Sequence, residues 1–274
     1  MTPEMRRVLV EGVAELGAPL TGIEFQSIGL RGIPAARFPP TTQSATGPIV
    51  YVHGGAFVAG SSRSHRYICS ALARRTGAPV YSIDYRLAPE HPYPAAIDDV
   101  TEAIRALGES TVGSGIVLAG DSAGGTIALL AAQRLKRDSG HRIAGIALVS
   151  PIADLRCTSA TYEQFGAADP FISRQRLKAD ISQFLRNADP SDPDVSPALA
   201  DLSALPPIFI QVGSEEVLLG DTLALERAAN KASVPVTVKI WPGMIHVWHA
   251  FPKYLEDSDR ALEEMARFLR EALK

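Results

Sequence analysis

From Pro48 onward, short apolar segments alternate with segments of helical pattern, and this alternation limits the possible folds more than any other feature of the chain. We expect strands at 48–52, 79–84, 115–119, 143–150, 207–212 and 236–241, and helices at 64–75, 95–107, 123–136, 221–232 and 254–273. Buried strands that alternate with helices form a parallel sheet covered on both faces. The sequence therefore predicts an α/β fold with a mostly parallel central sheet.

Three segments lie outside this alternation. Residues 2–16 predict a helix that begins with Thr2 and Pro3 and ends at Gly17, with Met5, Val8, Leu9, Val13 and Leu16 on one face. Two alternating runs, at 23–28 and 35–38, predict antiparallel edge strands. Residues 154–193 are polar and mixed, with a helical pattern near 175–185. We expect one domain over 1–274, with a small helical cap from about 1–20 and 155–193.

The composition excludes several classes of protein. Hydrophobic residues make up 46% of the 274 residues and charged residues 21%, as in an ordinary globular protein. Two cysteines are too few for a disulfide framework or a zinc site. A net charge of −3 gives no electrostatic reason to bind nucleic acid or an anionic membrane. No apolar run is long enough to span a bilayer and the amino terminus lacks signal-peptide features, so a cytoplasmic location is expected.

Residues 120–124 read Gly-Asp-Ser-Ala-Gly, a G-x-S-x-G pattern, and directly follow the apolar segment 116–119. A helix rich in small residues follows. A strand that turns at once into a helix leaves the serine exposed at the helix amino terminus, where developing negative charge is favoured. The sequence predicts Ser122 as a nucleophile. The alternative is a serine that only caps a helix.

A second glycine-rich turn, His53-Gly54-Gly55-Ala56, follows the predicted strand 48–52. Backbone N–H groups in such a turn can stabilise the oxyanion formed during acyl transfer. We expect an oxyanion hole from the Gly55, Ala56 and Ala123 amides, with Gly54 shaping the turn. The alternative is an ordinary loop.

A serine hydroxyl needs a base to accept its proton, and that base needs a carboxylate to orient it. In an α/β hydrolase the order along the chain is serine, acid, histidine. Only His246 and His249 follow the last predicted strand, and the turn before His246 makes it the first choice. The acid should follow strand 207–212, where the candidates are Glu215, Glu216 and Asp221. Asp221 suits a helix start better, and the residues alone leave both glutamates open.

Taken together, these motifs carry a family signature. The chain resembles the bacterial hormone-sensitive-lipase-like esterases of the α/β-hydrolase fold, through HGGAFVAGS at 53–61, YRLAPEHPYPAA at 85–96, GDSAGG at 120–125, VSPALADLSALPP at 195–207 and VGSEEVLLGD at 212–221. The resemblance implies Glu216 as the acid and His246 as the base. It also implies that Tyr85, Arg86 and Glu90 build the region under the oxyanion loop, as structural and not catalytic residues.

The resemblance implies hydrolysis of carboxylic esters with a short to medium acyl chain, through an acyl-enzyme and without metal or organic cofactor. The sequence departs from the family pattern in three places. Ala56 and Val247 stand where glycines are usual, and the amino-terminal part is short, which favours a more open pocket. Aromatic residues are candidates for the pocket lining, with plain core packing as the alternative: Phe57, Tyr162, Phe165, Phe171 and Trp248.

Two other classes of function share this fold. One is a small-molecule receptor that has lost catalysis, although this chain keeps Ser122 and His246. The other is an amidase, peptidase or acyltransferase. The resemblance also implies a possible homodimer through residues 236–241 and 254–273.

Overall fold

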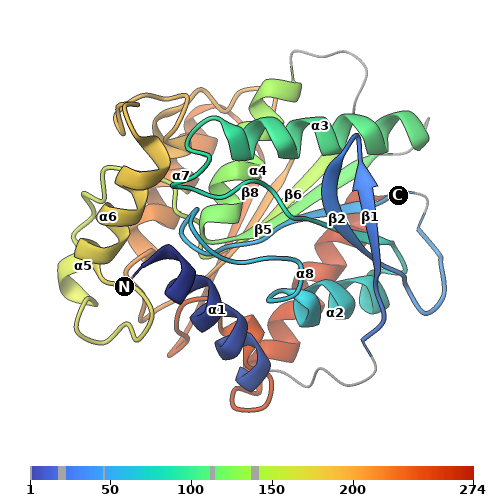
Figure 1. Cartoon of the computed structure of the whole chain (residues 1–274), viewed down its shortest axis with the longest axis horizontal. Coiled ribbons are helices and arrows are strands. Elements are labelled where there is room, and N and C mark those ends of the chain that lie inside the picture. Colours follow the sequence, from blue (N-terminus) through green and yellow to red (C-terminus); the bar gives the residue numbers. More distant parts are fainter. Residues whose placement is uncertain (1, 18–22, 46, 112–114, 137–141) are drawn as a thin grey trace.

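A computed structural model of the chain describes residues 2–17, 23–45, 47–111, 115–136 and 142–274. In this part of the chain a single sheet of eight strands runs through the molecule in the order β1-β2-β4-β3-β5-β6-β7-β8 (Figure 1). The strands are β1 (Gln26–Leu30), β2 (Ile33–Phe38), β3 (Ile49–Val52), β4 (Val80–Ile83), β5 (Ile116–Asp121), β6 (Ile143–Val149), β7 (Ile208–Gly213) and β8 (Val236–Trp241).

The six strands β3 to β8 are parallel to one another, as predicted. β1 pairs antiparallel with β2, and β2 pairs antiparallel with β4. One expectation is wrong. β2 is not an edge strand, because it pairs with β4 as well as with β1. Its Ala35, Ala36 and Phe38 are buried. Alternating polar and apolar residues indicate a half-buried strand but do not show how many neighbours that strand has.

Helices cover both faces of the sheet. α2 and α8 pack against one face, whereas α3, α4 and α7 pack against the other (Figure 1). Apolar residues of the β5 strand therefore contact helices on both sides. The helices are α1 (Pro3–Gly17), α2 (Arg66–Thr76), α3 (Ala95–Ser110), α4 (Ala123–Leu135), α5 (Thr161–Gln164), α6 (Arg174–Leu185), α7 (Leu219–Lys231) and α8 (Asp257–Ala272), with short 3₁₀ turns at Pro197–Leu199 and Trp248–Ala250.

The parallel strands all end at the same edge of the sheet, and the predicted site residues follow these ends. Ser122 comes directly after β5, Glu216 after β7 and His246 after β8. Ligands of open α/β sheets bind in the crevice outside the carboxyl ends of the strands. The topology therefore brings residues that are distant in the sequence to one place.

Two segments lie beyond this edge. α1 and α6 lie side by side there (Figure 1), joined by an ion pair between Arg6 of α1 and Asp180 of α6. Residues 1 and 18–20 of the expected cap lie outside the described residues. Within α1, Leu9 and Val13 line the cavity beneath, although Leu9 is also 51% exposed. Met5 and Val8 are 59% and 74% exposed and do not line it. No helix in the described part of the chain is both long enough and apolar enough to cross a membrane.

Candidate active site

Ser122 lies in the tight turn between β5 and α4. Its backbone has φ of 52° and ψ of −124°, a strained conformation for a residue with a side chain. The turn is held by a hydrogen bond of 2.9 Å from the Ser122 amide to the carbonyl of Val149. A Cβ atom at Gly124 would lie 2.0 Å from the Val52 carbonyl oxygen, so only glycine permits this close packing of helix on strand.

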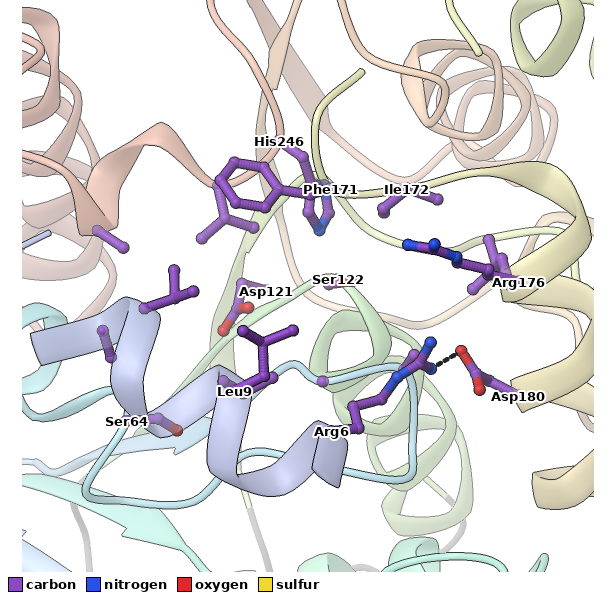
Figure 2. A pocket seen from close by; sticks show the side chains of 18 of the residues that line it. Arg6, Leu9, Ser64, Asp121, Ser122, Phe171, Ile172, Arg176, Asp180 and His246 are labelled. Atoms are coloured by element: carbon purple, nitrogen blue, oxygen red, sulfur yellow. Dashed lines mark hydrogen bonds and ion pairs between the residues drawn. The ribbon is translucent and has the colours of Figure 1, made fainter. Parts of the chain in front are cut away.

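His246 and Glu216 form a buried hydrogen-bonded pair. The Nδ1 atom of His246 lies 2.9 Å from Oε2 of Glu216. The other carboxylate oxygen of Glu216 accepts hydrogen bonds from the Ser150 hydroxyl at 2.8 Å and from the Gly213 amide at 2.6 Å. Because three donors hold this carboxylate, it fixes the orientation of the imidazole, which points into the cavity above Ser122 (Figure 2).

The surroundings of His246 favour its protonated form. Burial alone would lower the pKa of this histidine. The hydrogen bond and the charge of Glu216 outweigh burial and raise the pKa above its usual value, with help from the charges of Asp169 and Asp121. Such an arrangement stabilises the imidazolium that forms when a base takes a proton.

The turn after β3 brings backbone amides to the same cavity. Gly55 and Ala56 line it, and their φ angles are +123° and 53°. Among the described residues, the amides of Gly55, Ala56 and Ala123 donate to no protein acceptor. The Gly54 amide instead donates to the Asp121 carboxylate at 3.1 Å. The first three amides are thus available for an oxyanion, and Gly54 shapes the turn.

A second buried pair, His65 and Asp121, lies directly beneath the turn. The Nε2 atom of His65 is 3.2 Å from Asp121, and the Tyr51 hydroxyl donates to the same carboxylate at 2.8 Å. Burial would raise the pKa of Asp121, but the charge and hydrogen bond of His65, with the hydroxyl of Tyr51, hold it at about 2. Sequence reasoning missed this pair. Asp121 has a signal, as it lies inside the G-x-S-x-G pattern, whereas His65 has none.

The three residues expected to support the oxyanion loop have different partners. The Tyr85 hydroxyl donates to the carbonyl of His53 at 2.7 Å, and the two rings stack with centroids 4.2 Å apart. Arg86 binds Asp99 of α3. Glu90 binds Arg7 of α1 at 2.7 Å. Only Tyr85 therefore supports the loop directly, and Glu90 anchors the helix that covers the site.

The cavity has a volume of about 260 Å³, and both Ser122 and His246 line it (Figure 2). Of the five aromatic candidates, only Phe171 lines it. Phe57 is wrong as a lining residue because it is buried and stacks on Phe184 at 4.0 Å. Tyr162 and Trp248 are buried, and Phe165 packs against the core. Aliphatic residues of α1 supply much of the apolar wall instead: Leu9, Val10, Val13 and Ala14.

The alternative acids and base lie elsewhere. His249 is fully buried, and its Nε2 lies 2.8 Å from the side chain of Gln211. Glu215 is exposed. Asp221 is buried in α7, where its carboxylate accepts hydrogen bonds from the Ala153 and Asp154 amides at 3.0 Å. None of these side chains lines the cavity.

In the described ranges, no group of three or more His, Cys, Asp or Glu side chains has an arrangement that could hold a metal ion. Both cysteines, Cys69 and Cys157, are unpaired and buried. Acyl transfer by a serine and a histidine requires only the groups already described.

Comparisons with known proteins identify the family of this chain. A profile of the α/β hydrolase fold family matches residues 49–250. An acetyl-hydrolase of Streptomyces hygroscopicus is 44% identical over 82% of this chain and 75% of its own length. An esterase of Acinetobacter venetianus is 35% identical over 98% of this chain and 89% of its own.

Solved structures are similar over the whole chain. A crystal structure of an esterase from the bacterial hormone-sensitive lipase family has a TM-score of 0.95 and 33% identity, covering 100% of this chain and 93% of that one. A crystal structure of EstE5 soaked with p-nitrophenyl butyrate has a TM-score of 0.93 and 34% identity, with coverages of 100% and 92%. The chain belongs to the bacterial hormone-sensitive-lipase-like esterases of the α/β-hydrolase fold.

Proposed function

We propose that this protein hydrolyses carboxylic esters with short to medium acyl chains, with Ser122 as nucleophile, His246 as general base and Glu216 as the orienting acid. One observation carries most of the proposal. The hydrogen bond from His246 to the fully buried Glu216 holds the imidazole in the same cavity as Ser122. A histidine so oriented keeps Nε2 toward the serine hydroxyl.

In the first half of the reaction, the Ser122 hydroxyl attacks the ester carbonyl carbon while Nε2 of His246 takes the hydroxyl proton. The tetrahedral intermediate collapses, and the imidazolium gives its proton to the departing alcohol. In the second half, His246 takes a proton from water, which attacks the acyl-enzyme. Collapse of the second intermediate releases the acid and returns the proton to Ser122.

The negative oxygen of both intermediates needs donors that are already in place. The Gly55, Ala56 and Ala123 amides are the donors in this proposal, because they line or border the cavity and make no other hydrogen bond in the described structure. Each such donor contributes about 10²–10³ to the rate in other hydrolases.

The chain-length preference rests on the size of the cavity. Its volume of about 260 Å³ is below the ~300–1,000 Å³ of sites for drug-sized ligands, which favours small substrates. The acetyl-hydrolase relative and the structure of EstE5 soaked with p-nitrophenyl butyrate point the same way.

The test is hydrolysis of p-nitrophenyl esters from acetate to laurate by the wild type and by Ser122→Ala. We expect the highest kcat/KM at the short end of the series and its loss in the variant. Hydrolysis at the wild-type rate by Ser122→Ala would contradict the mechanism. No hydrolysis of any ester by the wild type would instead favour the receptor alternative, and faster hydrolysis of an anilide than of its matching ester would favour an amidase.

We also propose a homodimer through β8 and α8. β8 pairs only with β7 among the described strands, and Ile240 on it is 47% exposed. An unpaired strand edge is a template for a second copy. In the same way we interpret the chain as one domain whose cap is α1 together with residues 155–193. A cytoplasmic location stays a prediction from the sequence.

A further inference from the structure

One charged side chain of the cavity has no partner. Four of the residues that line the cavity are Asp or Arg, and three of them are already engaged: Arg6 with Asp180, and Asp121 with His65. The fourth is Arg176 of α6. Within the described residues, its guanidinium donates to no acceptor and lies in no ion pair.

Arg176 faces the site. Figure 2 shows its guanidinium extending from α6 into the space between Ile172 and the Arg6–Asp180 pair. The cap therefore presents two guanidinium groups to the cavity, and one carboxylate, Asp180, serves only the first of them. The charge of Arg176 also helps to lower the pKa of Arg6, after the larger effect of burial. Arg6 and Arg176 are therefore close enough for their charges to interact.

The rest of this wall is apolar or already hydrogen-bonded. Ile172 and Leu177 flank Arg176 along the cavity, and the Ser173 hydroxyl accepts a hydrogen bond from the Arg176 amide. An unpaired cation beside apolar groups and next to a second cation favours a bound anion. The planar guanidinium fork matches the two oxygens of a carboxylate better than any other side chain does.

We propose that Arg176 binds a carboxylate carried by the ester substrate, so that the enzyme prefers half-esters and other anionic esters to neutral esters of the same size. This inference rests on the proposed ester hydrolysis and names its substrate class. Arg176 is exposed to solvent, which screens the interaction and makes it moderate in strength. Arg176 is a specificity residue here and takes no part in bond breaking.

The test compares matched pairs of esters. For an anion on the acyl side, the pair is mono-4-nitrophenyl adipate and 4-nitrophenyl hexanoate, which share a six-carbon acyl chain. For an anion on the alcohol side, the pair is 4-carboxyphenyl acetate and 4-acetylphenyl acetate. Each ester is assayed with the wild type, with Arg176→Gln and with Lys178→Gln. Lys178 lies on the same helix, is exposed and does not line the cavity, so its variant controls for the loss of one charge.

In at least one pair, we expect Arg176→Gln to lower kcat/KM for the anionic ester about tenfold, mainly by raising KM, and to change the neutral ester less than twofold. Lys178→Gln should leave kcat/KM for every ester within twofold of the wild-type value. Arg176→Glu should lower kcat/KM for the anionic ester further. Added salt should reduce the preference of the wild type for the anionic ester.

Equal effects of Arg176→Gln on the anionic and the neutral member of both pairs, or no effect on either, would overturn the inference. The neutral esters keep this separate from the proposed function. If the wild type hydrolyses them through Ser122 and Arg176→Gln shows no selective loss, only the anion site fails. If the wild type hydrolyses neither the neutral nor the anionic esters, ester hydrolysis itself fails.

Discussion

Glu216 accepts a hydrogen bond of 2.9 Å from His246, whereas its neighbour in the sequence, Glu215, faces solvent. The two carboxylates are one residue apart, yet only one can orient the imidazole. The difference comes from the turn after β7, where Glu216 points inward to Ser150 and the Gly213 amide. The order of residues along the chain does not show which of two neighbouring side chains in a turn points inward, so the sequence alone could not choose between the two glutamates.

Replacing the two glutamates should therefore have unequal effects. Glu216→Ala removes the group that orients His246, and we expect kcat to fall roughly 10³- to 10⁴-fold, as with other triad acids. Glu215→Ala is the matched control and should retain activity within about twofold. Rates with a p-nitrophenyl ester decide between them. Similar losses in both variants would contradict the assignment of Glu216.

The pH dependence follows from the raised pKa of His246. A general base must be neutral, so kcat/KM should fall as the pH drops through this pKa, which lies above the usual histidine value. Glu216→Gln removes the negative charge that stabilises the imidazolium. The acid limb of the residual activity should then move to lower pH. Profiles of kcat/KM from pH 4 to 9 give the acid limb of the wild type and that of the variant. An acid limb at the same pH in both would contradict the effect of the Glu216 charge on the pKa of His246.

The fold follows from the sequence because its main signal is periodic. Apolar strands such as β5 and β7 are buried on both faces, so each reads as a continuous apolar run between helical segments. The predicted α/β-hydrolase fold is confirmed. β2 is the exception, since pairing with β4 depends on a neighbour more than 40 positions away, and local alternation carries no information about it.

The parts of the site set by local turns could be predicted, and those set by tertiary packing could not. Ser122 lies in a turn whose flanking glycines are visible in the sequence. The His65–Asp121 pair and the placement of Arg176 depend on α2 and α6 meeting the strand ends, which no local pattern encodes. Four of the five aromatic candidates were wrong for a similar reason. Phe57 and Phe171 look alike in the sequence, but Phe57 is buried, whereas Phe171 lines the cavity and is 42% exposed.

Val247 gives a prediction about stability. It stands where the family usually has glycine, and its φ of 50° is in the left-handed region, which a β-branched residue adopts only with strain. Val247→Gly should stabilise the fold by about 1 kcal/mol, or ~2–4 °C in Tm, after the entropy cost of glycine. Val247→Ala loses the β-branch but keeps a Cβ at the same φ, so it should gain less than the glycine variant. A lower Tm for the glycine variant would refute the strain.

Asp221 makes stability depend on pH. Burial, with the charge of Asp154, raises its pKa from 3.8 to about 7, and one carboxylate oxygen has no hydrogen-bond partner in the described structure. Between about pH 4 and pH 7 the unfolded chain loses this proton while the folded protein keeps it. The Asp221 contribution to stability therefore falls as the pH rises through that window.

Asp221→Asn cannot ionise and should flatten this dependence. Tm measured at half-unit steps from pH 4 to pH 8 should decline less in the variant than in the wild type over that window. Asp194→Asn, which changes an exposed aspartate, serves as the control and should follow the wild type. Parallel curves for Asp221→Asn and the wild type would show that Asp221 is already ionised in the folded protein.

The central claim is that Ser122 is a nucleophile activated by His246, and covalent labelling tests it most directly. The protein would be treated with a fluorophosphonate, digested and analysed by mass spectrometry. We expect a single adduct on the peptide that contains Ser122, formed at least ~10³ times more slowly in His246→Ala and not at all in Ser122→Ala. An adduct on another residue, or labelling of Ser122 at an unchanged rate without His246, would contradict it.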